Sequence, residues 1–254
     1  DGYPREMFVA TLSENETVLQ RIERKDEVTI SSAPRWIPQT HDLLYIAEQK
    51  TRRPLLRISG VGNGQQEATK AVITNNLICW GFSIAAKTRE IVALVGSSIS
   101  LTSVVKATFD PNFVTVIANP NSHIESWQLP TVKVVQWQAP DGTTIEGVLE
   151  LPHGYNPSDG PLPMYVHLHG GPTSSVSVDL EFSMYGRGLL STNGWAVLCP
   201  NYRGSTGYGD KFITDLIGRE NDIEVQDILA GVDAMVKRGI ADPDRLAVGG
   251  WSNG

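Results

Sequence analysis

The spacing of apolar residues changes near Thr131, and this change limits the chain to two kinds of structure in succession. Before it, short runs of β-branched residues are separated by turn signals, as at residues 43–47 and 91–95. After it, apolar strands alternate with helical stretches, which is the pattern of βαβ units. We therefore predict a β domain over residues 1–130 and an α/β domain over residues 131–254.

The first domain contains a weak internal repeat. Trp36 and Phe82 precede two of the apolar runs and are 46 positions apart, and Leu44 and Ile91, within those runs, are 47 apart. A period in the forties is typical of propeller blades, because each four-stranded blade must stack on its neighbours to bury both faces. Two copies cannot close a ring, so we predict the last blades of a longer β-propeller. The alternative is an unrelated β-sandwich with evenly spaced strands.

The second domain begins with two strands joined at Asp141-Gly142, a strong hairpin signal. Residues 164–168 and 195–199 are almost wholly apolar, as in parallel strands that are covered on both faces. Together they predict a largely parallel sheet at the centre of this domain.

One clear helix is predicted between Gly218 and Gly239, followed by a turn at residues 242–245 and a strand at residues 246–249. The apolar residues of the helix follow a helical period and predict a single buried face. They are Val225, Ile228, Leu229, Val232, Met235 and Val236.

The last predicted strand leads directly into Gly250-Trp251-Ser252-Asn253-Gly254. A Gly-x-Ser-x-Gly sequence after a parallel strand is the signature of a nucleophile elbow, a strained turn that projects the serine hydroxyl from the sheet. The residues at the two outer positions must be small, because larger side chains would collide with the neighbouring strand and helix. Ser252 is the candidate nucleophile, and the backbone N–H of Asn253 is a candidate donor to an oxyanion.

A second glycine motif, His169-Gly170-Gly171-Pro172, follows the strand predicted at residues 164–168. An oxyanion hole needs two donors that are fixed before charge develops on the carbonyl oxygen. A glycine has no Cβ, so its amide can approach a substrate closely, and Gly170 and Gly171 suit the second donor. Taken alone, Gly-Gly-Pro would be an ordinary turn.

A third glycine-rich segment, Asn201-Tyr202-Arg203-Gly204-Ser205-Thr206-Gly207-Tyr208-Gly209, follows the strand predicted at residues 195–199. It leaves the edge of the sheet where binding sites form in open α/β folds. Arg203 could anchor a carboxylate of a ligand or hold the loop through an internal ion pair, and we favour the ion pair.

In this order and spacing, the three motifs resemble those of the prolyl oligopeptidase family of serine peptidases, in particular its acylaminoacyl-peptidase and dipeptidyl-peptidase branch. The resemblance is strong over residues 134–254 and faint before them. It implies an α/β-hydrolase domain, with a doubly wound and mainly parallel sheet, preceded by the last blades of a β-propeller.

The resemblance also implies roles for single residues. Ser252 would be acylated, and the amides of Asn253 and of the Gly170-Gly171 pair would form the oxyanion hole. His169 would shape its loop and not act as the base. The supporting residues are His169, Pro172, Arg203, Gly250 and Gly254.

The triad acid and histidine of an α/β-hydrolase follow the serine in chain order. All five histidines precede Ser252, and the sequence does not start with methionine. We therefore expect a chain truncated after the elbow, with an incomplete hydrolase domain, that is inactive alone. The parent protein would hydrolyse short peptides by aminoacyl-, acylaminoacyl- or dipeptidyl-type cleavage.

Composition argues against several other classes. The chain has 28 acidic and 21 basic residues, a net charge of −7, so phosphate backbones would repel it and nucleic-acid binding is not expected. No run approaches the roughly 18 apolar residues that a membrane-spanning helix needs, so no membrane partner is expected. Cys79 and Cys199 lie far apart and make no metal spacing, so buried free thiols are expected. No metal or organic cofactor is implied.

Two other functions stay open. One is a carboxylesterase or lipase-like hydrolase, although lipases favour a third glycine where this chain has Pro172. The other is a non-catalytic, propeller-containing interaction module. The expected partners are short peptides, and a homo-oligomer stays open. A cytoplasmic location is favoured over secretion, for which the sequon Asn15-Glu16-Thr17 is the supporting sign.

Overall fold

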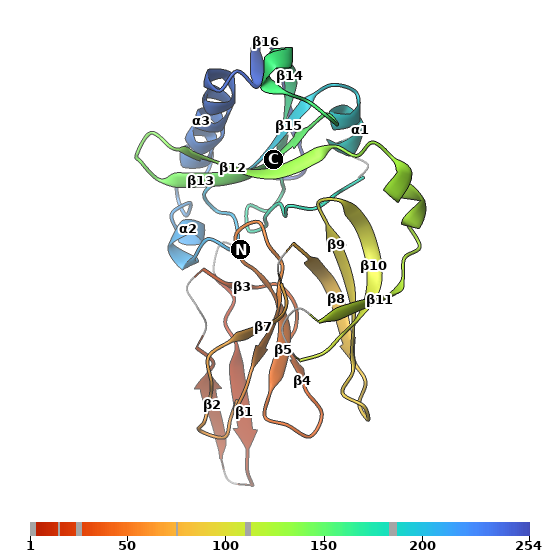
Figure 1. Cartoon of the computed structure of the whole chain (residues 1–254). Helices are drawn as coiled ribbons and strands as arrows, with labels where there is room; N and C mark the ends of the chain where they lie inside the picture. Colours follow the sequence, from red (N-terminus) through yellow and green to blue (C-terminus); the bar gives the residue numbers. More distant parts are fainter. Residues whose placement is uncertain (1–3, 15, 24–26, 75, 110–112, 183–186) are drawn as a thin grey trace.

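The computed structural model describes residues 4–14, 16–23, 27–74, 76–109, 113–182 and 187–254. Asn15 of the sequon lies outside them. Figure 1 shows two parts that contact each other: antiparallel sheets formed by residues 8–118 and a mixed sheet formed by residues 131–250. No described helix is long and apolar enough to cross a membrane.

The first part contains two antiparallel sheets that follow one another along the chain. One has the order β4-β5-β6-β7, with the short β3 also paired to β5, and the other has the order β11-β10-β9-β8. A hairpin of β1 (Phe8–Leu12) and β2 (Thr17–Arg21) precedes them. The strands are β3 (Thr29–Ile30), β4 (Arg35–Trp36), β5 (Leu43–Glu48), β6 (Leu55–Ile58), β7 (Lys70–Ile73), β8 (Ile78–Ile84), β9 (Ile91–Ser97), β10 (Ser100–Ala107) and β11 (Val114–Ala118).

The sequence repeat corresponds to these two sheets strand by strand. Trp36 lies on β4 opposite Leu43 of β5, and Phe82 lies on β8 opposite Ala93 of β9. Side chains of both sheets share one buried core, to which the first contributes Leu44, Leu55 and Ile73 and the second Ile91, Ala93 and Val105. The expected stacking of two similar four-stranded units is therefore present.

The second part is a five-stranded sheet in which β14 and its two neighbours run parallel. The order is β12-β13-β15-β14-β16, and β12, β13 and β15 pair antiparallel. The predicted hairpin turn joins β12 to β13, with Gly142 at φ 85°. The strands are β12 (Thr131–Gln138), β13 (Thr144–Leu151), β14 (Leu162–Leu168), β15 (Ala196–Asn201) and β16 (Ala241–Gly250).

Helices cover both faces of this sheet. Helix α3 (Ile223–Lys237) packs on the face that carries Leu149, Val166 and Leu198. The other face carries Val148 and Val197 and is covered by α1 (Arg187–Thr192) together with Val176 and Val178. The remaining helices are η1 (Ser122–Ser126), η2 (Pro157–Asp159) and α2 (Asp210–Thr214). Because both faces are covered, the central strands can be apolar along their whole length.

The predicted buried face of α3 is partly wrong. Four of its six apolar residues pack against the core: Ile228, Val232, Met235 and Val236. Val225 and Leu229 are exposed, and Asp227 and Gly231 are buried in their place. The indole of Trp137 explains the rotation, since it donates to the Asp227 carbonyl at 2.8 Å. A Cβ on Gly231 would lie 2.7 Å from the same ring. The helix is therefore oriented by a close contact and a buried carboxylate, and not by its apolar residues alone.

The turn predicted at residues 242–245 lies inside β16. Leu162 pairs with Ala241 and Met164 with Leu246, so β16 carries three extra residues between these pairs. Asp242 Oδ1 accepts from the Asp244 amide at 2.9 Å, which gives the bulge the local hydrogen bond of a turn. The local signal was correct, but strand pairing resumes on both sides of it.

We predict that Gly231→Ala destabilises the protein by about 1 to 3 kcal/mol, because the new methyl group overlaps the Trp137 ring. Helix propensity alone predicts the opposite sign, a gain of about 1 kcal/mol. Urea unfolding measures the difference. The control is Asp233→Ala on the exposed face of α3, which should change stability by less than about 0.5 kcal/mol. A Gly231→Ala protein more stable than wild type would contradict the packing.

Candidate active site

Ser252 lies in a strained turn directly after β16. Its φ is 54°, in the left-handed region that non-glycine residues rarely adopt. A Cβ on Gly250 would lie 2.6 Å from the carbonyl oxygen of Leu168, and one on Gly254 would lie 2.5 Å from the same atom. Only glycine at these two positions lets the turn pass the end of β14, so the predicted need for small residues there holds.

The structure brings the glycine loop after β14 next to this turn. We call residues 169–174 the oxyanion loop. A Cβ on Gly170 would lie 3.3 Å from Ser252 Cβ and 2.9 Å from the Trp251 carbonyl oxygen, so backbone here meets backbone. Within the described part of the chain, the amides of Gly170, Gly171 and Asn253 donate to no protein acceptor. These three N–H groups are therefore available to a substrate oxygen that lies beside Ser252.

The side chain of Tyr202 packs against the start of the oxyanion loop. Its buried hydroxyl donates to the His169 carbonyl at 2.6 Å. Burial raises the pKa of this phenol, and a hydrogen bond with the side chain of Asn253 opposes the shift. The Tyr202 ring also stacks on the imidazole of His169, with centroids 4.5 Å apart. The Tyr202 side chain therefore fixes the start of the oxyanion loop.

His169 is fully engaged inside its loop. Nδ1 donates to the Gly170 carbonyl at 2.9 Å, and Nε2 lies 2.9 Å from Ser205 Oγ. Burial lowers the pKa of His169 to about 4, so the ring is neutral at pH 7. These contacts fit a residue that shapes the loop, as expected, and leave neither ring nitrogen directed at Ser252.

None of the five histidines, all of which are described, hydrogen-bonds to Ser252. His41 lies in the β4–β5 turn and His123 in η1. His153 bonds to the Leu129 carbonyl at 3.1 Å, and His167 lies on β14, where burial lowers its pKa. None of the described histidines is thus in hydrogen-bond contact with the Ser252 hydroxyl.

Arg203 forms the internal ion pair and not a ligand anchor. Its guanidinium is buried against Asp227 of α3, at 2.7 Å, and it also bonds to Asp141 in the β12–β13 turn. The Asp227 hydrogen bonds are the main cause of a raised pKa for Arg203, and the backbone amide of Arg203 donates to the same carboxylate at 2.9 Å. The ion pair fixes the 201–209 loop to the hairpin turn and to α3.

A cavity of about 410 Å³ borders the elbow. It is lined by Gly170 and Trp251 of the second part and by Trp80, Leu101 and Thr102 of the first part. Its floor contains a buried ion cluster in which Arg187 bonds to Glu150, to Glu181 at 2.9 Å and to the Asp179 carbonyl at 3.1 Å. The cavity therefore lies between the two parts of the molecule.

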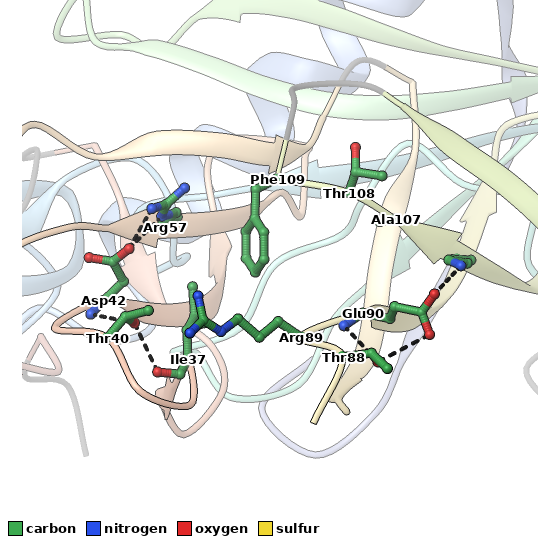
Figure 2. A pocket seen from close by; sticks show the side chains of 11 residues that line it. Ile37, Thr40, Asp42, Arg57, Thr88, Arg89, Glu90, Ala107, Thr108 and Phe109 are labelled. Atoms are coloured by element: carbon green, nitrogen blue, oxygen red, sulfur yellow. Dashed lines mark hydrogen bonds and ion pairs between the residues drawn. The ribbon is translucent and has the colours of Figure 1, made fainter. Parts of the chain in front are cut away.

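A second cavity, of about 450 Å³, lies between the two antiparallel sheets (Figure 2). Its charged walls are paired with each other, Arg57 with Asp42 and Lys106 with Glu90. Glu90 precedes β9, whereas Ser97 at the other end of β9 contacts the second part. This cavity is lined by residues of the first part alone and shares none of them with the cavity at the elbow.

Neither thiol is placed for chemistry. Cys79 and Cys199 are buried and unpaired with each other, and burial raises the pKa of each to about 12. The expectation of buried free thiols is confirmed. Among the described residues, no group of three or more His, Cys, Asp or Glu side chains could hold a metal ion.

Comparison with known proteins shows what the chain is similar to. Residues 180–254 match the sequence model of the prolyl oligopeptidase family. This part of the chain therefore resembles that family. The acylamino-acid-releasing enzyme of Arabidopsis thaliana is 40% identical over 92 residues, which are 36% of this chain and 12% of that enzyme. Dipeptidyl aminopeptidase BIII of Pseudoxanthomonas mexicana is 32% identical over 123 residues, 45% of this chain and 17% of that enzyme.

A solved acylaminoacyl peptidase, in complex with Z-Gly-Gly-Phe-chloromethyl ketone, has the same fold over 98% of this chain. The TM-score is 0.79 at 15% sequence identity, and the chain covers 36% of that protein. The chain therefore spans about a third of the length of this solved peptidase. The similarity extends through the first part of the chain, where the sequence resemblance was faint.

Sequence reasoning missed several residues of this site. Tyr202 was part of a noticed motif, but nothing in its spacing showed that its hydroxyl reaches His169. Asp227 was missed because the predicted apolar face of the helix placed it on the opposite, solvent-facing side. The Arg187 cluster gave no signal, since Glu150 lies 37 positions from Arg187 on a different element.

We predict a specific pH dependence from Asp179. Burial raises the pKa of this carboxyl to about 6, above the roughly 3.9 of an exposed aspartate. The folded protein therefore holds the proton more tightly, and this stabilisation is complete below about pH 4 and lost as the pH rises through 6. Asp179→Asn removes the titration, so its stability relative to wild type should increase between pH 4 and 7.

Urea unfolding at several pH values measures this difference. The matched control is Asp244→Asn, an exposed carboxylate, whose difference from wild type should not rise in this way. A pH-independent difference for Asp179→Asn would show that the carboxyl titrates normally.

Proposed function

We propose that the whole protein that carries this chain is a serine peptidase acting on short peptides, with Ser252 as the nucleophile. The observation that carries the proposal is the left-handed turn of Ser252, held beside Gly170 with three backbone amides unengaged. A strained residue at a position that exposes its hydroxyl is the arrangement of a nucleophile elbow.

The proposed reaction has two steps. Ser252 Oγ attacks the peptide carbonyl carbon and loses its proton to a base, and the carbonyl oxygen becomes an oxyanion that accepts from Asn253 N–H and from Gly170 or Gly171 N–H. The amine then leaves with the proton. Water adds to the acyl-enzyme in the same way, releasing the acid and restoring the serine hydroxyl.

The base and its orienting carboxylate are proposed to lie outside the described residues. Both nitrogens of His169 are engaged, and no described histidine bonds to Ser252. The chain covers 36% of the solved peptidase, so the whole protein has room for these residues if its length is similar. Residues 1–130 would then be the last blades of a propeller, and residues 131–254 the first part of an α/β-hydrolase domain.

Peptides are the proposed substrates because the cavity at the elbow lies between the two parts, where a propeller would restrict entry. The names of the relatives support aminoacyl-, acylaminoacyl- or dipeptidyl-type cleavage, and the family resemblance supports the serine mechanism. Trp80 and Trp251, which both line the cavity, would contact the bound peptide.

A fluorophosphonate should label the whole protein stoichiometrically, and Ser252→Ala should abolish both labelling and peptide hydrolysis. Acyl-alanine and dipeptide nitroanilides measure the hydrolysis. The matched control is Ser158→Ala, which removes an exposed serine and should leave both unchanged. Labelling with hydrolysis of esters only would support a carboxylesterase instead. Absence of labelling would support a non-catalytic module and contradict the proposal.

Residues 1–254 alone should not turn over these substrates, because Ser252 has no base to accept its proton. The rate should equal that of the Ser252→Ala form of the same polypeptide. Hydrolysis by residues 1–254 that disappears in Ser252→Ala would mean that one of the five histidines moves to serve as the base.

A further inference from the structure

We propose that Thr206 and Glu48 position the oxyanion loop from the first part of the chain. The inference rests on the proposed function, since it concerns the rate of the reaction at Ser252. It gives a structural role to the 201–209 loop, which contacts the oxyanion loop on one side and β5 on the other.

The inner side of the 201–209 loop supports the whole oxyanion loop. Tyr202 bonds to the His169 carbonyl at its start, and Ser205 Oγ lies against the His169 ring. The Thr206 amide donates to the Ser174 carbonyl at 2.9 Å, at its end. In between, a Cβ on Gly204 would lie 3.1 Å from Pro172 Cβ. A shift of the supporting loop would therefore move Gly170 and Gly171.

The outer side of the same loop is fixed to the first part. Thr206 Oγ1 donates to Glu48 Oε2 at the end of β5. The Gly207 amide donates to Thr29 Oγ1 at 2.9 Å, and the Lys50 amide donates to the Gly207 carbonyl at 2.7 Å. A Cβ on Gly207 would lie 2.8 Å from the Lys50 nitrogen, so the two backbones touch here.

Glu48 is itself a rigid acceptor. Its other carboxylate oxygen binds Arg53 at 2.9 Å and Ser31 at 3.1 Å, and its side chain is 12% exposed. Arg53 in turn lies over the Trp80 ring, 4.7 Å from the centroid, and Trp80 lines the cavity at the elbow. The Glu48 carboxylate, which holds Thr206, is thus connected through Arg53 to Trp80, a residue that lines the same cavity as Gly170.

The backbone amide of Thr206 bonds to the oxyanion loop, and its hydroxyl bonds to Glu48, 158 positions before it in the sequence. Thr206 therefore connects the oxyanion loop to β5. Donors of an oxyanion hole act only when they are held in place before the charge develops. Misplacement by about 1 Å can cost on the order of 100-fold in rate. Loss of the Thr206 hydroxyl should therefore reduce kcat by about 10- to 100-fold with KM nearly unchanged.

The experiment compares Thr206→Val with Thr206→Ser in the whole protein. Valine keeps the shape and removes the hydroxyl, and serine keeps the hydroxyl, so serine should restore most of kcat. The matched control is Thr214→Val, which removes a hydroxyl bonded to the Asp210 carbonyl within α2 and should leave kcat unchanged. For each variant kcat, KM and Tm are measured with a peptide nitroanilide.

Wild-type kcat in Thr206→Val overturns the inference, and so does a loss that serine does not restore. If Thr206→Val fails to fold, Glu48→Gln and Glu48→Ala replace it, because glutamine retains an acceptor for Thr206 and alanine does not. The inference then requires a higher kcat for glutamine than for alanine. Failure of the proposed function is distinct, because the wild-type protein would then show no Ser252-dependent hydrolysis.

Discussion

Gly250 and Gly254 both lie so close to the carbonyl oxygen of Leu168 that neither position admits a side chain. This contact between the end of β16 and the end of β14 determines where everything else at the site lies. It forces the chain into the left-handed turn at Ser252, and it places Gly170, two residues after Leu168, beside that turn. The conformation of Ser252 and the position of the loop after β14 are therefore linked by one packing contact.

Two buried arginines stabilise the sheet edge that carries this contact, one on each face. Arg203 joins the 201–209 loop to α3 and to the β12–β13 turn, and Arg187 joins α1 to Glu150 of β13. Removing one partner of a buried pair costs about 3 to 5 kcal/mol, because the other charge stays buried without compensation. Moving either arginine away from its partners would therefore cost several kcal/mol, so these ion pairs hold the surrounding loops in place. Such rigidity suits a site that must be organised before a reaction begins.

The sequence was sufficient wherever a local rule determined the structure. The elbow, the hairpin at Asp141-Gly142 and the 46-residue repeat depend on neighbouring residues, and each is present. The predicted buried face of α3 was partly wrong because Trp137, which Gly231 contacts, lies 94 positions away in the sequence. The contact between Thr206 and Glu48 also joins residues that are distant in the sequence, so no local pattern predicts it. The domain limits, the cytoplasmic location and the cleavage type stay predictions, since they depend on the whole protein.

The first part of the molecule contributes to the site through its backbone as well as its side chains. The Val178 amide donates to the Thr51 carbonyl at 3.0 Å, and the Leu180 amide donates to the Ser97 carbonyl at 2.7 Å. These bonds fix the segment that carries Asp179 between the sheets and the oxyanion loop. Because residues of both parts line the cavity at the elbow, its width is set by the position of the sheets relative to β14. Under the proposed function, selectivity for a peptide would then depend on the contact between the two parts. Replacing the side chain of Thr51 or Ser97 should matter less than a change that moves the backbone there, because both residues make this contact through their carbonyl groups.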